Sequence, residues 1–150
     1  MDIRQRARSF LTFILALILA ANGLAMLAAP HDWYHATPGV TGTGPLNLHF
    51  VRDIGCAYLV AAGGLFWLWR DPQAWRAAIA GSAFLVLHAL VHVGEMVFGS
   101  FDLHHLLRDL PGVFLIPVFA VWLSWPRTSS ISTKENPYAE MARTAPARRF

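Results

Sequence analysis

The feature that most constrains the fold is a stretch of 23 residues without Asp, Glu, Lys or Arg, from Ser9 to His31. A helix rises about 1.5 Å per residue and the hydrocarbon core of a bilayer is about 30 Å thick, so about 20 apolar residues make one crossing. Only 14% of the chain is charged, against roughly 25% in soluble domains. The sequence therefore predicts an all-α integral membrane protein, a four-helix bundle with spans at about 9–29, 49–69, 76–98 and 109–126.

These spans form one predicted transmembrane domain, residues 1–126, followed by a tail at 127–150. The tail is rich in Ser, Thr and charge and has no apolar period, so we expect it to be disordered. The basic N-terminus before an apolar run has the layout of a signal peptide. The run exceeds the usual apolar region of about 7–15 residues, and we therefore expect a retained anchor.

Basic residues are distributed unevenly between the two ends of the predicted spans. Ten of the twelve fall on one side: Arg4, Arg6, Arg8, Arg70, Arg76, Arg127, Lys134, Arg143, Arg148 and Arg149. By the positive-inside rule, both termini and the tail are cytoplasmic, and loops 30–48 and 99–109 are outside. Five of the six tryptophans fall at the predicted cytoplasmic rim. We expect a multi-pass protein of a bacterial inner (plasma) membrane, oriented N-in and C-in.

All seven histidines fall in the predicted outer (periplasmic) half, together with most of the carboxylates. Ionisable groups inside a span are costly and usually face a bundle interior or a cavity, so they are site candidates. His49 and Asp53 are four residues apart and share a helix face, as do His88, His92 and Glu95 on the third span. Since the two spans run antiparallel, we expect Asp53 to lie near His92 and His49 near Glu95.

Imidazoles combined with carboxylates suit a transition metal such as Zn, Fe or Cu. We expect His104 and His105 to close the site from the outer loop, with Arg52 and Arg108 as ion-pair partners or ligands. The predicted metal ligands are His49, Asp53, His88, His92, Glu95, His104 and His105.

Other interpretations of the same residues stay open. They could form a buried network of hydrogen bonds and ion pairs that holds the outer ends together, a bis-histidine haem pocket, or a site that handles protons. The lone Cys56 is expected to be a packing residue. The first hypothesis is thus a metal- or redox-linked membrane protein, with enzymatic activity left open. The alternative is a non-catalytic accessory or assembly subunit. Besides lipid we expect a membrane-protein partner or a homo-oligomer, and no nucleic acid, since no basic cluster is interleaved with aromatic residues.

The segment NLHFVRDIGCAYLVAAGG places an Arg-Asp pair at the entry of a Gly/Ala-rich span. In this respect residues 10–126 resemble the small four-span bacterial membrane proteins of the DoxX-like type. The resemblance implies a four-span bundle with Arg52 and Asp53 as site residues. Some members of that group are similar to quinone-linked or redox-associated subunits. The many histidines of this chain depart from the general pattern.

Overall fold

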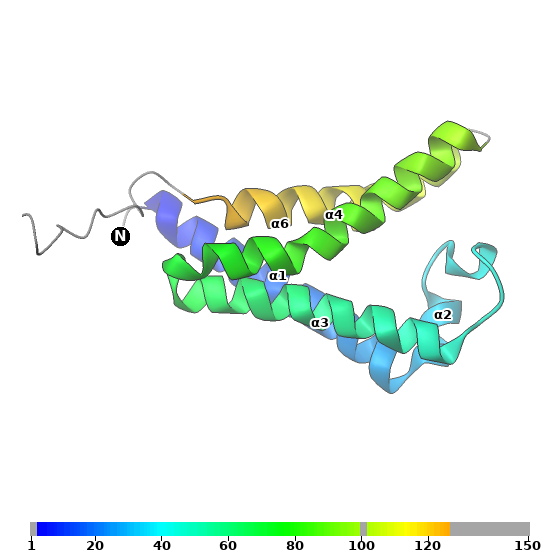
Figure 1. The fold of residues 1–150 in the computed structure, drawn as a ribbon, viewed down its shortest axis with the longest axis horizontal. Helices are drawn as coiled ribbons and strands as arrows, with labels where there is room; N and C mark the ends of the chain where they lie inside the picture. Colours follow the sequence, from blue (N-terminus) through cyan, green and yellow to red (C-terminus); the bar gives the residue numbers. More distant parts are fainter. Residues whose placement is uncertain (1–2, 100–101, 127–150) are drawn as a thin grey trace, which may run out of the picture.

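The computed structural model describes residues 3–99 and 102–126, so the predicted tail at 127–150 lies outside the described residues. Four helical segments are long and apolar enough to cross a membrane. They comprise α1 (Ile3–Ala28), α3 (Leu48–Arg70), α4 (Trp75–Phe98) with the turn before it, and a fourth span at Leu103–Ser124. The prediction of an all-α bundle with four spans is confirmed (Figure 1).

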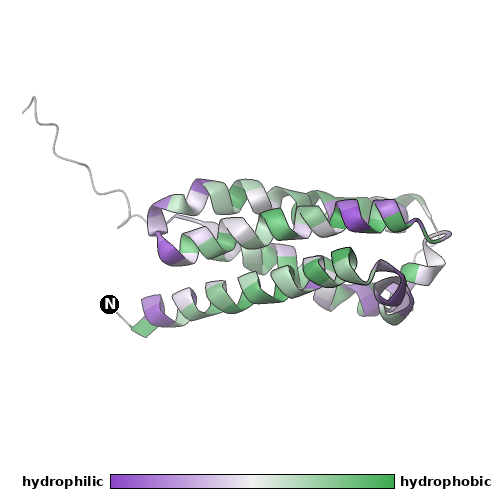
Figure 2. Cartoon of the chain, turned by 90° about the horizontal axis from the view of Figure 1, so that it is seen from below, coloured by the Kyte–Doolittle hydropathy of each residue, from purple (hydrophilic) through white to green (hydrophobic). Residues whose placement is uncertain are grey.

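Polar and apolar residues are separated along the long axis of this bundle. Figure 2 shows hydrophilic residues concentrated near the two ends, with a mainly hydrophobic band between them. We call the end with the α1 N-terminus, the α3–α4 connection and Trp125 the tryptophan end. The opposite half, which carries the seven histidines, is the histidine end. Such an apolar band is what a multi-pass protein presents to the lipid bilayer.

Short elements connect the spans, and local sequence explains where they begin. At the histidine end, α2 (Pro30–Ala36) and the 3₁₀ turn η1 (Val40–Gly42) lead into α3. The side-chain oxygen of Asn47 accepts hydrogen bonds from the backbone N–H groups of His49 and Phe50, which caps the first turn of α3. At the tryptophan end, the 3₁₀ turn η2 (Pro72–Ala74) joins α3 to α4.

Small residues let the helices approach closely. A Cβ added at Gly64 of α3 would lie 2.8 Å from the Ala77 carbonyl oxygen of α4, and one at Gly81 would lie 2.9 Å from the Val60 oxygen. On the other side of α3, a Cβ at Gly23 would lie 2.8 Å from the Gly55 oxygen. Because there is no hydrophobic driving force between helices in lipid, such close backbone packing is what holds spans together.

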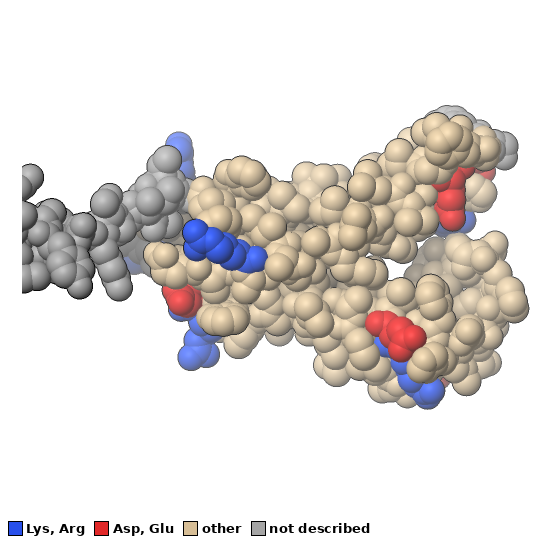
Figure 3. All heavy atoms as spheres, viewed as in Figure 1, with Lys and Arg blue, Asp and Glu red and all other residues tan. Residues whose placement is uncertain are grey.

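The shared core lies toward the tryptophan end. Residues of all four spans contribute to it, among them Leu19, Leu65, Ala78 and Ala120. The buried residues of α4 end at Leu85, so its second half packs little against α3. Figures 1 and 3 show the consequence, since α4 diverges from α1 and α3 and leaves a notch at the histidine end.

The fourth span is a composite helix. It starts with α5 (Leu103–Asp109), passes through a π-helical segment, η3 (Leu110–Leu115), and ends as α6 (Ile116–Ser124). The wide turns of η3 immediately precede Pro117, which has no N–H and whose ring would crowd the carbonyl four residues earlier. The π-helical segment thus accommodates the proline without ending the span.

Candidate functional site

The most buried polar cluster of the histidine end joins α4 to α5. Nδ1 of His92 lies 3.1 Å from Oδ2 of Asp109, and Nε of Arg108 donates to Oδ1 of the same carboxylate at 2.9 Å. The His92 and Asp109 side chains are 20% and 16% exposed. To donate to an ionised carboxylate, His92 must carry a proton on Nδ1. Both carboxylate oxygens of Asp109 are therefore engaged by neighbouring side chains.

Arg108 also connects this cluster to the loop between α2 and α3. Gly39 has a positive φ of 86°, and a Cβ added there would collide with Cζ and Nε of Arg108. The guanidinium group therefore lies directly against the loop backbone. We call His92, Asp109, Arg108 and Gly39 the latch, because they link α4 and α5 to the segment that leads into α3.

A row of rings continues from the latch along α4. The rings of His92 and His88 are 4.8 Å apart, His88 stacks on Phe84 at 5.9 Å, and Phe84 meets the edge of Tyr58 of α3 at 5.6 Å. Glu95, which the helical spacing places on the same face, is exposed. Helical spacing predicted that these three α4 residues share a face. In the structure His88 and His92 are in contact, and Glu95 lies nearer the end of the helix.

The predicted residues of α3 form a separate and more exposed group. Nε2 of His49 lies 3.4 Å from Oδ2 of Asp53, with the side chains 88% and 58% exposed. Nε of Arg52 donates to the Leu27 carbonyl at 3.4 Å, near the C-terminus of α1. Cys56 is exposed rather than packed inside the bundle. Asp53 is thus paired within its own helix, while His92 is paired with Asp109.

His104 and His105 lie on α5 and are exposed. Nδ1 of His105 lies 3.5 Å from Oδ2 of Asp102, whose other oxygen caps α5 through the His104 N–H. In residues 3–99 and 102–126, no three His, Cys, Asp or Glu side chains are grouped so that they could hold one metal ion. The seven predicted ligands are therefore divided between three helices, with two on α3, three on α4 and two on α5.

Asp109 is the central acceptor of the latch, and the sequence reasoning did not select it as a site residue. A signal for it exists in the chain. His-x-x-Arg-Asp occurs twice, at 49–53 and at 105–109, each time where a span begins at the histidine end. The repeat gives Asp109 and Asp53 the same place in their spans, yet only Asp109 has a histidine of the preceding span as partner.

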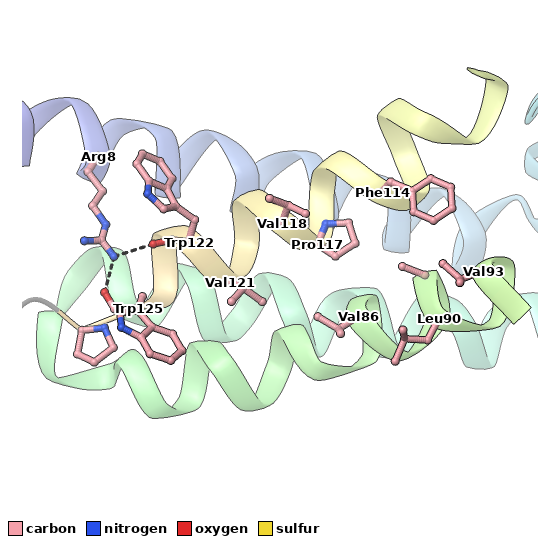
Figure 4. Close-up of a pocket in the computed structure, with 12 residues that line it drawn as sticks. Arg8, Val86, Leu90, Val93, Phe114, Pro117, Val118, Val121, Trp122 and Trp125 are labelled. Atoms are coloured by element: carbon pink, nitrogen blue, oxygen red, sulfur yellow. Dashed lines mark hydrogen bonds between the residues drawn. The ribbon is translucent and has the colours of Figure 1, made fainter. Parts of the chain in front are cut away.

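An apolar groove runs between α4 and α6, on the side of the bundle drawn in Figure 4. Its volume is about 640 Å³, and its lining includes Val86, Leu90, Val118 and Val121. One end of the groove lies at the tryptophan end of the bundle. There Arg8 of α1 donates hydrogen bonds to the carbonyl oxygens of Trp122, Leu123 and Trp125. This arginine satisfies carbonyl groups left free at the C-terminus of α6.

Comparison with known protein families, with curated proteins and with solved structures gives no match for this chain. The resemblance to the DoxX-like group therefore depends on the segment at 47–64 and the four-span layout. What is established is the class: a small four-span membrane protein with a helical bundle.

Proposed function

We propose that this chain is a non-catalytic accessory or assembly subunit of a membrane complex, and that the latch is a structural network. The observation that carries this proposal is the use of both Asp109 oxygens by Arg108 and His92. A carboxylate and an imidazole that satisfy each other inside a span lower the cost of placing ionisable groups there. They also leave fewer free electron pairs for a metal ion.

The surface of the bundle supports an assembly role. The second half of α4 presents Leu87, Val91 and Val97 outward, each more than half exposed and outside the groove between α4 and α6. In the bilayer this face contacts lipid or another transmembrane helix. We propose that it meets a membrane-protein partner or a second copy, with the chain in a bacterial inner membrane, N-in and C-in, and the histidine end outside.

A second candidate function is a metal- or redox-linked site that uses a transition metal such as Zn, Fe or Cu. The contact between the His88 and His92 rings, 4.8 Å apart and one turn along α4, favours it. The resemblance to the DoxX-like group, some of whose members are similar to redox-associated subunits, also favours this candidate. A haem group held by His49 together with His88 or His92 is a less favoured version of this second candidate.

One experiment separates the two candidates. The protein is purified in mild detergent without chelators, and its metal content, absorption spectrum and Tm are measured for wild type, His92→Ala and His49→Ala. A structural latch predicts a colourless, metal-free wild type. His92→Ala then destabilises the fold by about 1–3 kcal/mol, because Oδ2 of Asp109 loses its partner while Oδ1 keeps Arg108.

His49→Ala is the matched control, because it removes a histidine from a pair that is largely exposed. We expect it to change stability by less than about 1 kcal/mol. Wild type could instead contain about one metal ion per chain or show a haem Soret band. If His92→Ala lost that metal or band, the metal-linked proposal would replace the accessory one.

A further inference from the structure

A second cavity lies at the tryptophan end, away from the histidines. It has a volume of about 590 Å³ and is enclosed by the N-terminal turns of α1, the α3–α4 connection and the end of α6. The charged side chains that line it are Arg8 and Arg70. The nearest carboxylate along the chain, Asp71, lies between two lining residues and accepts a hydrogen bond from the Gln73 N–H, so it is turned to the backbone of the connection. A cavity of this size with a positive lining is suited to an anionic group.

The two arginines differ in how they are held. Arg8 donates to α6 carbonyl oxygens at 2.6–3.0 Å, which fixes its guanidinium group and offsets the negative end of that helix. Arg70 lies over the ring of Trp69 at 5.7 Å. Among the described residues no carboxylate forms an ion pair with Arg70, so its charge is available to a ligand at the cavity.

The remaining lining is amphipathic. Trp69, Trp75 and Trp125 contribute indole rings, which favour the headgroup level of a bilayer, while Leu68 and Leu123 contribute apolar surface. The helical turn η2 that leads into α4 is capped by the Asp71 carboxylate, so the positive charge at the cavity comes from the two arginines. The cavity can thus hold a group that is charged on one side and apolar on the other.

This cavity adjoins the apolar groove between α4 and α6. Arg8, Trp125 and Pro126 line both (Figure 4). From Trp125 the groove extends to Phe114, a helical length of about 16 Å at about 1.5 Å per residue. That length matches one leaflet, which is half of a hydrocarbon core about 30 Å thick. A cavity with two arginines that continues into an apolar groove one leaflet long has the form of a lipid site.

We propose that the cavity and the groove together bind one anionic phospholipid, with its phosphate at Arg70 and one acyl chain along α4 and α6. The continuity of the two cavities favours a lipid over a soluble phosphate compound, since a soluble compound would use the polar cavity alone. This site goes beyond the proposed assembly role and does not depend on the latch.

The test is native mass spectrometry of the full chain in detergent, titrated with phosphatidylglycerol or with phosphatidylcholine of the same acyl chains. The key variant is Arg70→Gln, and the matched control is Arg76→Gln. Arg76 stacks on the preceding tryptophan just as Arg70 does, 4.4 Å from the ring of Trp75, but does not line the cavity. We expect wild type and Arg76→Gln to prefer phosphatidylglycerol, and Arg70→Gln to bind it about fivefold more weakly.

A second pair of variants tests the groove. Ala89 lines it, whereas Leu87 on the same helix does not and is exposed. Ala89→Phe should lower binding of both lipids, while Leu87→Phe should leave it unchanged. Equal losses in Arg70→Gln and Arg76→Gln, or no preference between the two lipids in wild type, would overturn the proposal. So would displacement of phosphatidylglycerol by inorganic phosphate at low millimolar concentration, which would assign the cavity to a soluble phosphate compound.

Discussion

Gly39 combines two constraints at one residue. Its φ of 86° lies in the left-handed region, which costs an L-residue about 1 kcal/mol or more, and a Cβ there would collide with the Arg108 guanidinium group. We predict that Gly39→Ala lowers the free energy of unfolding by about 1–3 kcal/mol, measured by thermal or denaturant unfolding in detergent. Gly42→Ala is the control, since a Cβ there meets nothing within 4 Å. A Gly39→Ala protein as stable as Gly42→Ala would contradict the contact between the loop and Arg108.

At the residue scale, helical spacing predicted which α4 side chains share a face but not which residues lie opposite them. The positions of His88 and His92 on one face of α4 follow from helical spacing alone, and the rings do meet. Spacing does not say which neighbour lies opposite a face. His92 meets Asp109 of the fourth span rather than Asp53, because α4 has diverged from α3 at this level.

At the element scale, the contact between α3 and α4 depends on glycines that leave room for backbone. Gly64 and Gly63 are adjacent in α3, yet a Cβ at Gly64 would lie 2.8 Å from the Ala77 oxygen, while one at Gly63 would meet nothing within 4 Å. We predict that Gly64→Ala destabilises the bundle by about 1–3 kcal/mol, because the helices must separate. Gly63→Ala should leave Tm unchanged or raise it, since alanine favours a helix. Similar melting curves for the two variants would show that α3 and α4 do not cross here.

The four spans were predictable because bilayer thickness sets a minimum length for an apolar helix, and the sequence has four such segments. The π-helical segment at Leu110–Leu115 was not predictable in this way. Pro117 in mid-span predicts a local disturbance of the helix, but not that six residues before it adopt a π-helical form. The sequence placed His104 and His105 in an outer loop at 99–109. In the structure they lie on α5, which is part of the fourth span, Leu103–Ser124.

At the scale of the whole molecule, the bundle is packed at the tryptophan end and open at the histidine end (Figures 1 and 3). Composition could not predict this difference, because an apolar residue that faces lipid looks the same in sequence as one that faces a helix. Charge is more informative about orientation. The basic residues of the α1 N-terminus and of the α3–α4 connection lie at the tryptophan end, the same end as Trp125, while Arg52 and Arg108 lie at the other.

The last prediction concerns which end faces the cytoplasm. Cys56 is the single cysteine, so Cys56→Ala gives a background for two reporter variants, Thr43→Cys in the loop at the histidine end and Gln73→Cys in the α3–α4 connection. Because the positive-inside rule places the Arg70 and Arg76 connection in the cytoplasm, an impermeant maleimide should label Thr43→Cys in intact cells. It should label Gln73→Cys only after the membrane is permeabilised. The reverse labelling pattern would place the histidines in the reducing cytoplasm and the phospholipid cavity in the outer leaflet. Labelling of both reporter cysteines in intact cells would mean that no membrane shields the connection between α3 and α4.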